Sequence, residues 1–381
     1  MVMDLFSWDT MFTKLADIFH KTHRSFEAFQ IEASTYSALE CRVCPREIFG
    51  ERWIFQNMSM ETFEEIGRYF HLTKWVSFYG WGDPMENEQL FSMLRLAKEK
   101  GCLTGLSTNG THLNDTLSGE LLSTGLDLMV VFLEAATHEV QETLVAGSDF
   151  KRIMEQVEGF VRLRNVRGSD TPKVKLSFPM TRMNMRELPG LVPLAAKMGV
   201  DEASFHNLDY LPDERCNILR AFHHESPTAI FEQSIDEIHR LGKERNLSVK
   251  TSPLKAEEKL VCEHNPHKRA FFSASGAVAP CPYLMIPKKG DIRRIFMNRE
   301  VHVPQTSFGN IREEDFLSVW NKDSYRQFRE VFEQRKKAET NTVQLLDAFS
   351  NISASMLEQI TPKKPPSLSE LCQTCYKAYG L

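Results

Sequence analysis

Six of the eight cysteines in this 381-residue chain are grouped in a way that suits metal binding. Cys41 and Cys44 are separated by two residues, and Cys372 and Cys375 repeat that spacing. Cys262 and Cys281 lie in between, and Cys281 follows an expected turn. Thiolates in such patterns bind zinc or iron–sulfur clusters, or serve redox chemistry. The first pair alone is a weak signal, and two unrelated buried cysteines are the alternative.

Small and polar residues follow two of the strands that the sequence predicts. The turn from Gly80 to Pro84 is rich in glycine, and the next strand ends at Ser107 to Gly110. Glycine lets a ligand approach the backbone closely. Because the carboxyl ends of parallel strands hold the site in such folds, we expect both segments and the Cys41 loop to converge on one mouth.

Taken together, these motifs resemble the radical S-adenosylmethionine (SAM) superfamily over roughly residues 28–210. Gly80 to Pro84 matches its G-x-G-E-P stretch and Ser107 to Gly110 its T-N-G stretch. The resemblance implies a [4Fe–4S] cluster at the Cys41 loop, whose fourth iron binds SAM and whose electron cleaves it to methionine and a 5′-deoxyadenosyl radical. It also implies cofactor-binding positions at Gly80, Trp81, Gly82, Asp83, Ser107, Asn109 and Glu134.

The C-terminal part resembles a SPASM domain, in a shortened, twitch-like version. Cys262, Gly276 and Cys281 match its opening, and residues 308–329 match its bridging segment. The resemblance implies one auxiliary [4Fe–4S] cluster. On chemistry alone four thiolates suit zinc equally well, and the motifs of the first half favour iron–sulfur. The implied ligands are Cys262, Cys281, Cys372 and Cys375.

The first cysteine of the family's C-x3-C-x2-C motif is replaced by Ser37. A hydroxyl is far less acidic than a thiol near iron, so a cluster held by Cys41 and Cys44 alone is expected to be labile or absent. Three interpretations fit. The catalytic cluster has been lost naturally, Ser37 is an engineered substitution, or serine, water or another residue completes a working site.

The end of the fourth strand helps to weigh these interpretations. SPASM-type relatives often carry S-x-D-G-A-T there, whereas this chain has Phe132, Glu134 and Ala135 in place of Ser, Asp and Gly. One engineered change does not explain the additional differences, so natural degeneration is favoured. Two functions remain open. The first is an enzyme that modifies a peptide, protein or cofactor precursor. The second is a silent homologue that binds a substrate or an active radical SAM protein.

Several other residues have plainer interpretations. The loop from Met180 to Met185 could line a peptide-binding mouth, but an ordinary loop is favoured. His206 is interpreted as a satisfied core histidine, and His223 with His224 as a solvated loop. Cys102 begins a strand, which favours a core position over metal binding.

Strands and helices alternate through the first two thirds of the chain. This pattern predicts an α/β fold with a parallel sheet, open or curved into a partial (β/α) barrel. A continuous apolar run at 126–134 is typical of a buried parallel strand. The predicted strands are 29–35, 75–79, 102–107, 126–134, 173–179 and 202–208. The predicted helices are 61–70, 87–100, 113–123, 150–165, 188–198 and 228–247.

The rest of the chain departs from this alternation. The apolar residues of 4–22 have the spacing of an amphipathic helix. Residues 271–281 have the pattern of a β-hairpin that turns at Ser275 and Gly276. Helices are predicted over 313–336 and 341–359, before a proline-rich linker at 362–366. We therefore expect an N-terminal helix (1–27), a radical SAM-like barrel (28–225), a connecting segment (226–260) and an auxiliary-cluster domain (261–381).

The composition excludes several classes of protein. With 42% hydrophobic and 25% charged residues the chain is globular. A net charge of −5 argues against nucleic acid binding. The sequence contains no run of about 18 apolar residues, so no membrane span is predicted. Asp4 and Asp9 argue against a signal peptide. The cysteines are too sparse for a disulfide scaffold and are clustered instead. Together with the features above, this predicts a cytoplasmic location.

Overall fold

The computed structural model describes residues 24–223, 228–348 and 365–381. The helix predicted over 4–22 lies outside these residues. Within them, no helix is both long enough and apolar enough to cross a membrane.

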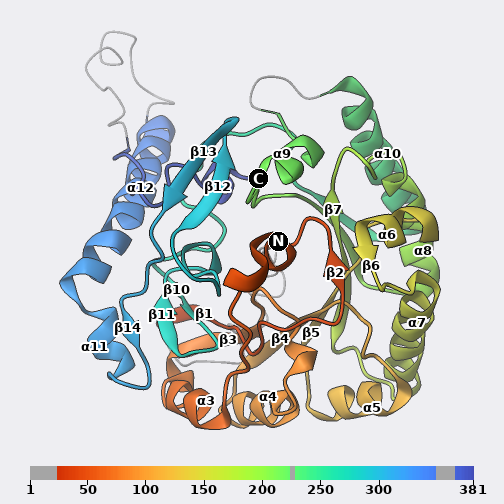
Figure 1. Cartoon of the computed structure of the whole chain (residues 1–381), viewed down its shortest axis with the longest axis horizontal. Helices are drawn as coiled ribbons and strands as arrows, with labels where there is room; N and C mark the ends of the chain where they lie inside the picture. The colour runs from red at the N-terminus through yellow and green to blue at the C-terminus, as the bar shows by residue number, and fades with distance from the viewer. Residues whose placement is uncertain (1–23, 224–227, 349–364) are drawn as a thin grey trace.

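A ten-stranded sheet forms the body of the molecule, in the order β14-β11-β10-β1-β3-β4-β5-β7-β8-β9. The eight strands from β10 to β9 run parallel, and β11 and β14 extend the sheet in antiparallel fashion. Helices ring the outside of this curved sheet (Figure 1). The predicted α/β fold of the partial-barrel type is confirmed.

Apart from β9, which adds a strand to the six predicted for the alternation, the elements of the barrel lie within a few residues of the predicted ranges. Its strands are β1 (Phe26–Ile31), β3 (Thr73–Phe78), β4 (Leu103–Thr108), β5 (Leu128–Phe132), β7 (Lys173–Met180), β8 (Glu202–Asn207) and β9 (Ser248–Thr251). Its helices are α3 (Met60–Gly67), α4 (Leu90–Glu99), α5 (Asp115–Ser123), α7 (Phe150–Val166), α8 (Leu188–Met198) and α10 (Ala229–Arg245). Gly199 caps α8 with a φ of 72°, a conformation that glycine adopts without strain.

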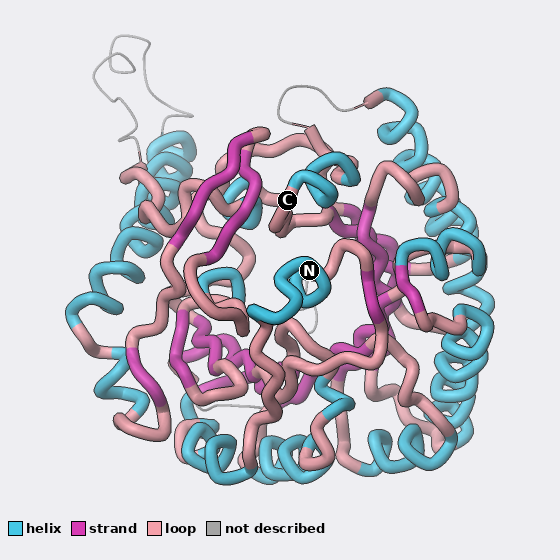
Figure 2. Tube along the Cα trace, viewed as in Figure 1, coloured by secondary structure: helices cyan, strands magenta, loops and turns pink. Residues whose placement is uncertain are grey.

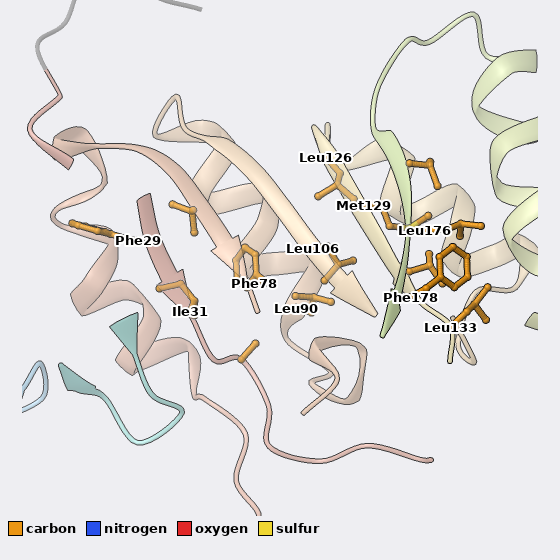
Figure 3. Packing of buried hydrophobic residues seen from close by; sticks show 14 of the residues in the cluster. Phe29, Ile31, Phe78, Leu90, Leu106, Leu126, Met129, Leu133, Leu176 and Phe178 are labelled. Carbon is orange, nitrogen blue, oxygen red and sulfur yellow. The ribbon is translucent and has the colours of Figure 1, made fainter. Parts of the chain in front are cut away.

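The main hydrophobic core lies between the sheet and its helices, where Phe29, Phe78 and Leu106 are buried (Figure 3). Strand β5 shows why its sequence is apolar throughout. Successive side chains of a strand point to opposite faces. Met129 joins the outer core, whereas Leu128 joins a second cluster inside the barrel. Both faces are therefore covered, as in parallel sheets generally.

The C-terminal region continues the barrel sheet. The predicted hairpin forms from β10 (Arg269–Phe272) and β11 (Ala277–Ala279), and β14 (Gly309–Asn310) follows β11. Strand β10 pairs in parallel with β1, with Ala28 opposite Arg269. The first strand of the chain is thus enclosed between two neighbours.

Two features of this region differ from the prediction. A ribbon of β12 (Ile292–Phe296) and β13 (Arg299–Val303), apart from the main sheet, was not foreseen (Figure 2). Its turn places Met297 at a φ of 48°, which methionine rarely adopts, so the sequence carries little turn signal.

The helix predicted over 313–336 is divided into α11 (Phe316–Trp320) and α12 (Asp323–Ala348). At the break, the Lys322 ammonium donates to the Phe308 carbonyl and to Glu314, which draws the chain back toward the sheet. Helix α12 also covers the start of the helix predicted over 341–359, and the rest of that range lies outside the described residues.

Candidate functional site

A cavity of about 130 Å³ lies at the carboxyl ends of β3, β4 and β5. It brings together every first-site residue named from the sequence. Their meeting follows from the parallel sheet, since the segments that leave neighbouring strands emerge at one edge. The predicted residues that line it are Ser37, Cys41, Cys44, Gly80, Trp81, Gly82, Asp83, Ser107, Asn109, Phe132 and Glu134.

Two short elements hold the first cysteine pair. Cys41 lies in β2 (Glu40–Cys41), which pairs with β6 (Val145–Ala146) after the fourth barrel strand. Cys44 precedes α2 (Pro45–Phe49), and its backbone N–H donates to the Cys41 carbonyl at 2.9 Å. Both thiols are free. Burial raises the pKa of Cys41, and nearby Glu134 and Cys44 raise it further.

Ser37 is held in the cavity by bonds within the protein. Its hydroxyl oxygen accepts from the Leu39 N–H at 3.3 Å and from the Asn109 side-chain amide at 3.4 Å. The buried Arg46 guanidinium donates to the carbonyls of Ser37, at 2.6 Å, and of Leu39. The position of the missing cysteine is therefore occupied by a hydroxyl whose partners are already in place.

Asp83 joins the second and third strand ends. Its carboxylate accepts from the Asn109 N–H at 2.8 Å, the Thr108 hydroxyl at 2.9 Å and the Met85 N–H at 2.9 Å. Burial raises its pKa, and these three bonds oppose that effect. Asp83 therefore fixes the Asn109 side of the cavity, while its own oxygens are largely used within the protein.

The glycines of the 80–84 turn are required by packing. A Cβ atom at Gly82 would lie 2.5 Å from the Tyr36 carbonyl oxygen, and one at Gly80 would lie 2.6 Å from Cγ of Glu32. The turn is thus pressed against the segment that leads to Ser37. Packing is therefore a second reason for glycine in this turn, besides the close approach of a ligand that the sequence predicts.

Glu32 is a buried residue of this region that sequence reasoning missed. Its carboxylate accepts from the backbone N–H groups of Trp81, at 3.1 Å, and Ala274, at 3.3 Å. Burial raises its pKa to about 7, although both bonds lower it. Glu32 therefore ties the cavity turn to the hairpin of the C-terminal region.

The altered fourth strand end also faces the cavity. Phe132 stacks on Tyr79 at a ring distance of 6.0 Å and meets the edge of His206 at 6.1 Å. Glu134 accepts from the Gln141 side chain at 2.9 Å, and burial raises its pKa. The ring of Phe132 thus forms part of the cavity wall, where the family pattern has serine.

The four C-terminal cysteines come from three distant segments and approach one another. Burial raises the pKa of Cys372, and Cys262, Cys375 and Cys281 each raise it further. Burial likewise raises the pKa of Cys281, with contributions from Cys375 and Cys262. Electrostatic effects of this kind fall off with distance, so the four thiols lie within range of one another's charge.

Two buried arginines hold the segments that carry these cysteines. Arg294 of β12 donates to the Leu371 carbonyl at 2.8 Å and to the Thr374 hydroxyl at 2.7 Å, within the Cys372–Cys375 segment. Arg335 of α12 donates to the Leu260 carbonyl at 2.8 Å and to the Pro366 carbonyl. These contacts span long sequence separations and were not predicted.

The remaining predicted residues have ordinary surroundings. Cys102 is buried in the core, as expected. In the Met180–Met185 loop both terminal methionines are buried, so they pack inside rather than line a mouth. His206 is only half satisfied: Nδ1 contacts the Ser177 hydroxyl at 3.3 Å, and buried Nε2 has no hydrogen-bond partner among the described residues. His223 contacts the Thr228 hydroxyl at 3.0 Å, and His224 lies outside the described residues.

The fold and the two cysteine centres define a class. Residues 262–343 match the SPASM family, described as an iron-sulfur cluster-binding domain. Taken with the relatives below, this match supports a radical SAM protein of the SPASM type.

Among curated proteins, the chain is similar to the tungsten-containing aldehyde ferredoxin oxidoreductase cofactor-modifying protein of Pyrococcus furiosus. The two are 26% identical over 78% of this chain and 82% of that protein. A probable GTP 3′,8-cyclase of Saccharolobus islandicus is also 26% identical, over 47% of this chain and 56% of its own length.

Among solved structures, Streptococcus suis SuiB bound to its precursor peptide SuiA is similar, with a TM-score of 0.57 and 17% identity. The match covers 85% of this chain and 73% of SuiB. The structure of anSMEcpe with bound AdoMet gives a TM-score of 0.57 and 14% identity, over 80% and 83% of the two chains. At these identities the likeness shows the fold alone.

Proposed function

We propose that this protein carries a [4Fe–4S] cluster on Cys262, Cys281, Cys372 and Cys375, binds SAM in the first cavity, and acts in the modification of a cofactor or peptide. The observation that carries the proposal is the match of residues 262–343 to an iron-sulfur cluster-binding domain, in a chain whose first cavity holds the first-site motif.

The description of the matched domain favours an iron–sulfur cluster over a single zinc ion. Zinc bonds sulfur at about 2.3 Å, so four zinc ligands would stand about 3.8 Å apart. Among the described residues, no three His, Cys, Asp or Glu side chains are grouped closely enough to hold one metal ion. Besides burial, other thiols of this set nevertheless raise the pKa of Cys372 and of Cys281, which supports treating the four as one ligand set.

The first cavity suits the polar ends of SAM, while its ligand set for iron is incomplete. Cys41 and Cys44 supply two thiols, and the Ser37 hydroxyl is bonded to Asn109 and Leu39. Backbone groups of the 80–83 turn and the Ser107 hydroxyl border the same space. When complete, a cluster at such a site supplies the electron that cleaves SAM. This chain's residues position the ligand and exclude water.

The relatives favour a modification reaction. The Pyrococcus relative, matched over most of both chains, is named for modifying a cofactor, and SuiB was solved with a precursor peptide. We infer a substrate of one of these two classes, reached through the barrel interior that Phe132 borders.

A second function is favoured by Ser37 itself. A hydroxyl at the first ligand position, together with Phe132 in the cavity wall, suits a catalytically silent homologue. Such a protein would bind a substrate or an active radical SAM partner, and its C-terminal cluster would transfer electrons or stabilise the fold. This second function retains the cluster at the four-cysteine site. It differs from the first function only in the cavity of Cys41 and Cys44, where SAM would not be cleaved.

Iron content and one substitution separate the two functions. The anaerobically reconstituted protein should hold about four iron atoms per chain, and Ser37→Cys should raise this to about eight. Ser37→Cys should also form 5′-deoxyadenosine from SAM under strong reductant. A matched Ser34→Cys variant, just outside the motif, should change neither quantity. If the unmodified protein holds about four iron atoms and does not cleave SAM, the silent function is supported, and if it already holds about eight and cleaves SAM, the enzyme is supported. If neither protein binds iron, the cluster proposal is wrong.

A further inference from the structure

We propose that Trp81 couples the two centres, so that occupation of the four-cysteine site strengthens SAM binding in the first cavity. The inference rests on the proposed function and concerns how its two sites influence each other. It begins from one side chain that belongs to both: Trp81 lines the first cavity and is almost fully buried.

The indole of Trp81 reaches directly into the C-terminal region. Its N–H donates to the Pro282 carbonyl at 3.0 Å, across 201 residues of sequence. Its ring meets Tyr283 edge-on at 5.5 Å and Tyr210 at 5.4 Å. Pro282 follows Cys281 immediately, so the position of a ligand cysteine sets the position of the hydrogen-bond acceptor of Trp81.

The backbone around Trp81 leaves little room for independent adjustment. Gly80 packs against Glu32, and Gly82 packs against the backbone of the segment before Ser37. Neither position has room for the methyl group of an alanine. The Trp81 N–H is bonded to Glu32 at 3.1 Å. A shift of Pro282 is therefore passed to the turn as a whole, because closely packed groups move together.

The same turn holds the other side of the cavity. The Asp83 N–H donates to the Tyr36 carbonyl at 2.7 Å, one residue before Ser37, and its carboxylate holds the Asn109 N–H at 2.8 Å. A short, continuous chain of bonds thus runs from the Cys281 loop through Trp81 to the groups that border the SAM space. Such a chain can transmit coupling, and a double-mutant cycle measures it.

The coupling has a defined direction. A cluster fixes Cys281 and with it Pro282, which keeps the Trp81 wall in place. Without the cluster the Cys281 loop relaxes, so part of the binding free energy of SAM is used to order Trp81, and the affinity for SAM falls. Coupling between sites typically changes affinity about 5- to 150-fold, and it acts equally in both directions.

The experiment measures binding of labelled SAM to the reconstituted full chain by equilibrium dialysis. Four proteins form the cycle: the unmodified chain, Cys375→Ala, Trp81→Phe and the double variant. Phenylalanine keeps an aromatic ring and removes the N–H donor. We expect Cys375→Ala to lower SAM affinity at least about fivefold in the unmodified chain, and less than about twofold in the Trp81→Phe chain. Trp320→Phe on α11 is the matched control and should leave the fivefold effect intact.

The outcomes separate this inference from the proposed function. If Cys375→Ala has the same effect with and without Trp81, or none in either, the coupling is absent. If none of the proteins binds SAM, the proposed function fails as well. Thermal unfolding monitors folding of each variant. Should Trp81→Phe not fold, Tyr283→Leu removes the ring contact from the other side, and the coupling should again fall below about twofold.

Discussion

Glu32 is buried at the junction of the barrel and the C-terminal hairpin, where it bonds the Trp81 and Ala274 N–H groups. Burial raises its pKa from 4.5 to about 7. The folded protein therefore binds a proton there more tightly than the unfolded chain between these pH values. Stability from this group is present below pH 4.5 and is lost as the pH rises to about 7.

Glu32→Gln removes this dependence, since glutamine does not titrate. The free energy of unfolding of the variant, relative to the unmodified protein, should rise between pH 4.5 and 7 by up to about 3 kcal/mol and then stay constant. Denaturant unfolding at a series of pH values measures the difference. The exposed Glu61→Gln is the control and should follow the unmodified protein. A relative stability that does not change with pH would show that the pKa of Glu32 is the same in the folded and unfolded states.

At the scale of elements, helix α12 organises the route into the four-cysteine site. Its Arg335, with a side chain only 2% exposed, donates to the carbonyls of Leu260, Lys259 and Pro366 and pairs with Glu258 at 2.7 Å. One side chain thus ties the segment before Cys262 to the segment before Cys372.

Arg335→Leu should leave these buried carbonyls without a donor and cost about 2–4 kcal/mol of stability. Because both entry segments loosen, iron retention at the C-terminal site should fall as well. Chemical denaturation and iron analysis of the purified protein measure the two effects. Arg326→Leu changes an exposed arginine of the same helix, paired with Asp323, and should cost less than about 1 kcal/mol. Equal costs for the two variants would contradict the role given to Arg335.

The elements that sequence alone could predict are those with local signals. The βα alternation, the Gly199 cap and the hairpin at Gly276 follow from periodicity and glycine. The first-site residues follow because each comes directly after a strand. Glu32, Arg294 and Arg335 could not be found in this way, since their partners lie far along the chain. The half-satisfied state of His206 depends likewise on what surrounds it in space.

At the scale of the whole molecule, the four-cysteine site joins segments more than a hundred residues apart. Cys375→Ala should remove most of the iron from a protein that holds one cluster, because three thiolates retain a cluster poorly. The C-terminal region should then become more sensitive to protease, since metal binding stabilises the segments it joins. Cys102→Ala, a core cysteine away from the site, should keep its iron. Unchanged iron and protease resistance in Cys375→Ala would show that the ligand set is wrong.

The parallel pairing of β1 with β10 also bears on how the chain folds during synthesis. Residues 28 and 269 are paired neighbours, so about 240 residues beyond residue 28 must emerge from the ribosome before this contact can form. Until then, β1 has a partner only in β3, and its other edge is an open row of backbone donors and acceptors. Such an edge can pair with other chains. Contacts of this sequence separation also form slowly. A product truncated before residue 269 would keep that edge uncovered, and we expect it to aggregate even though most of its barrel is present.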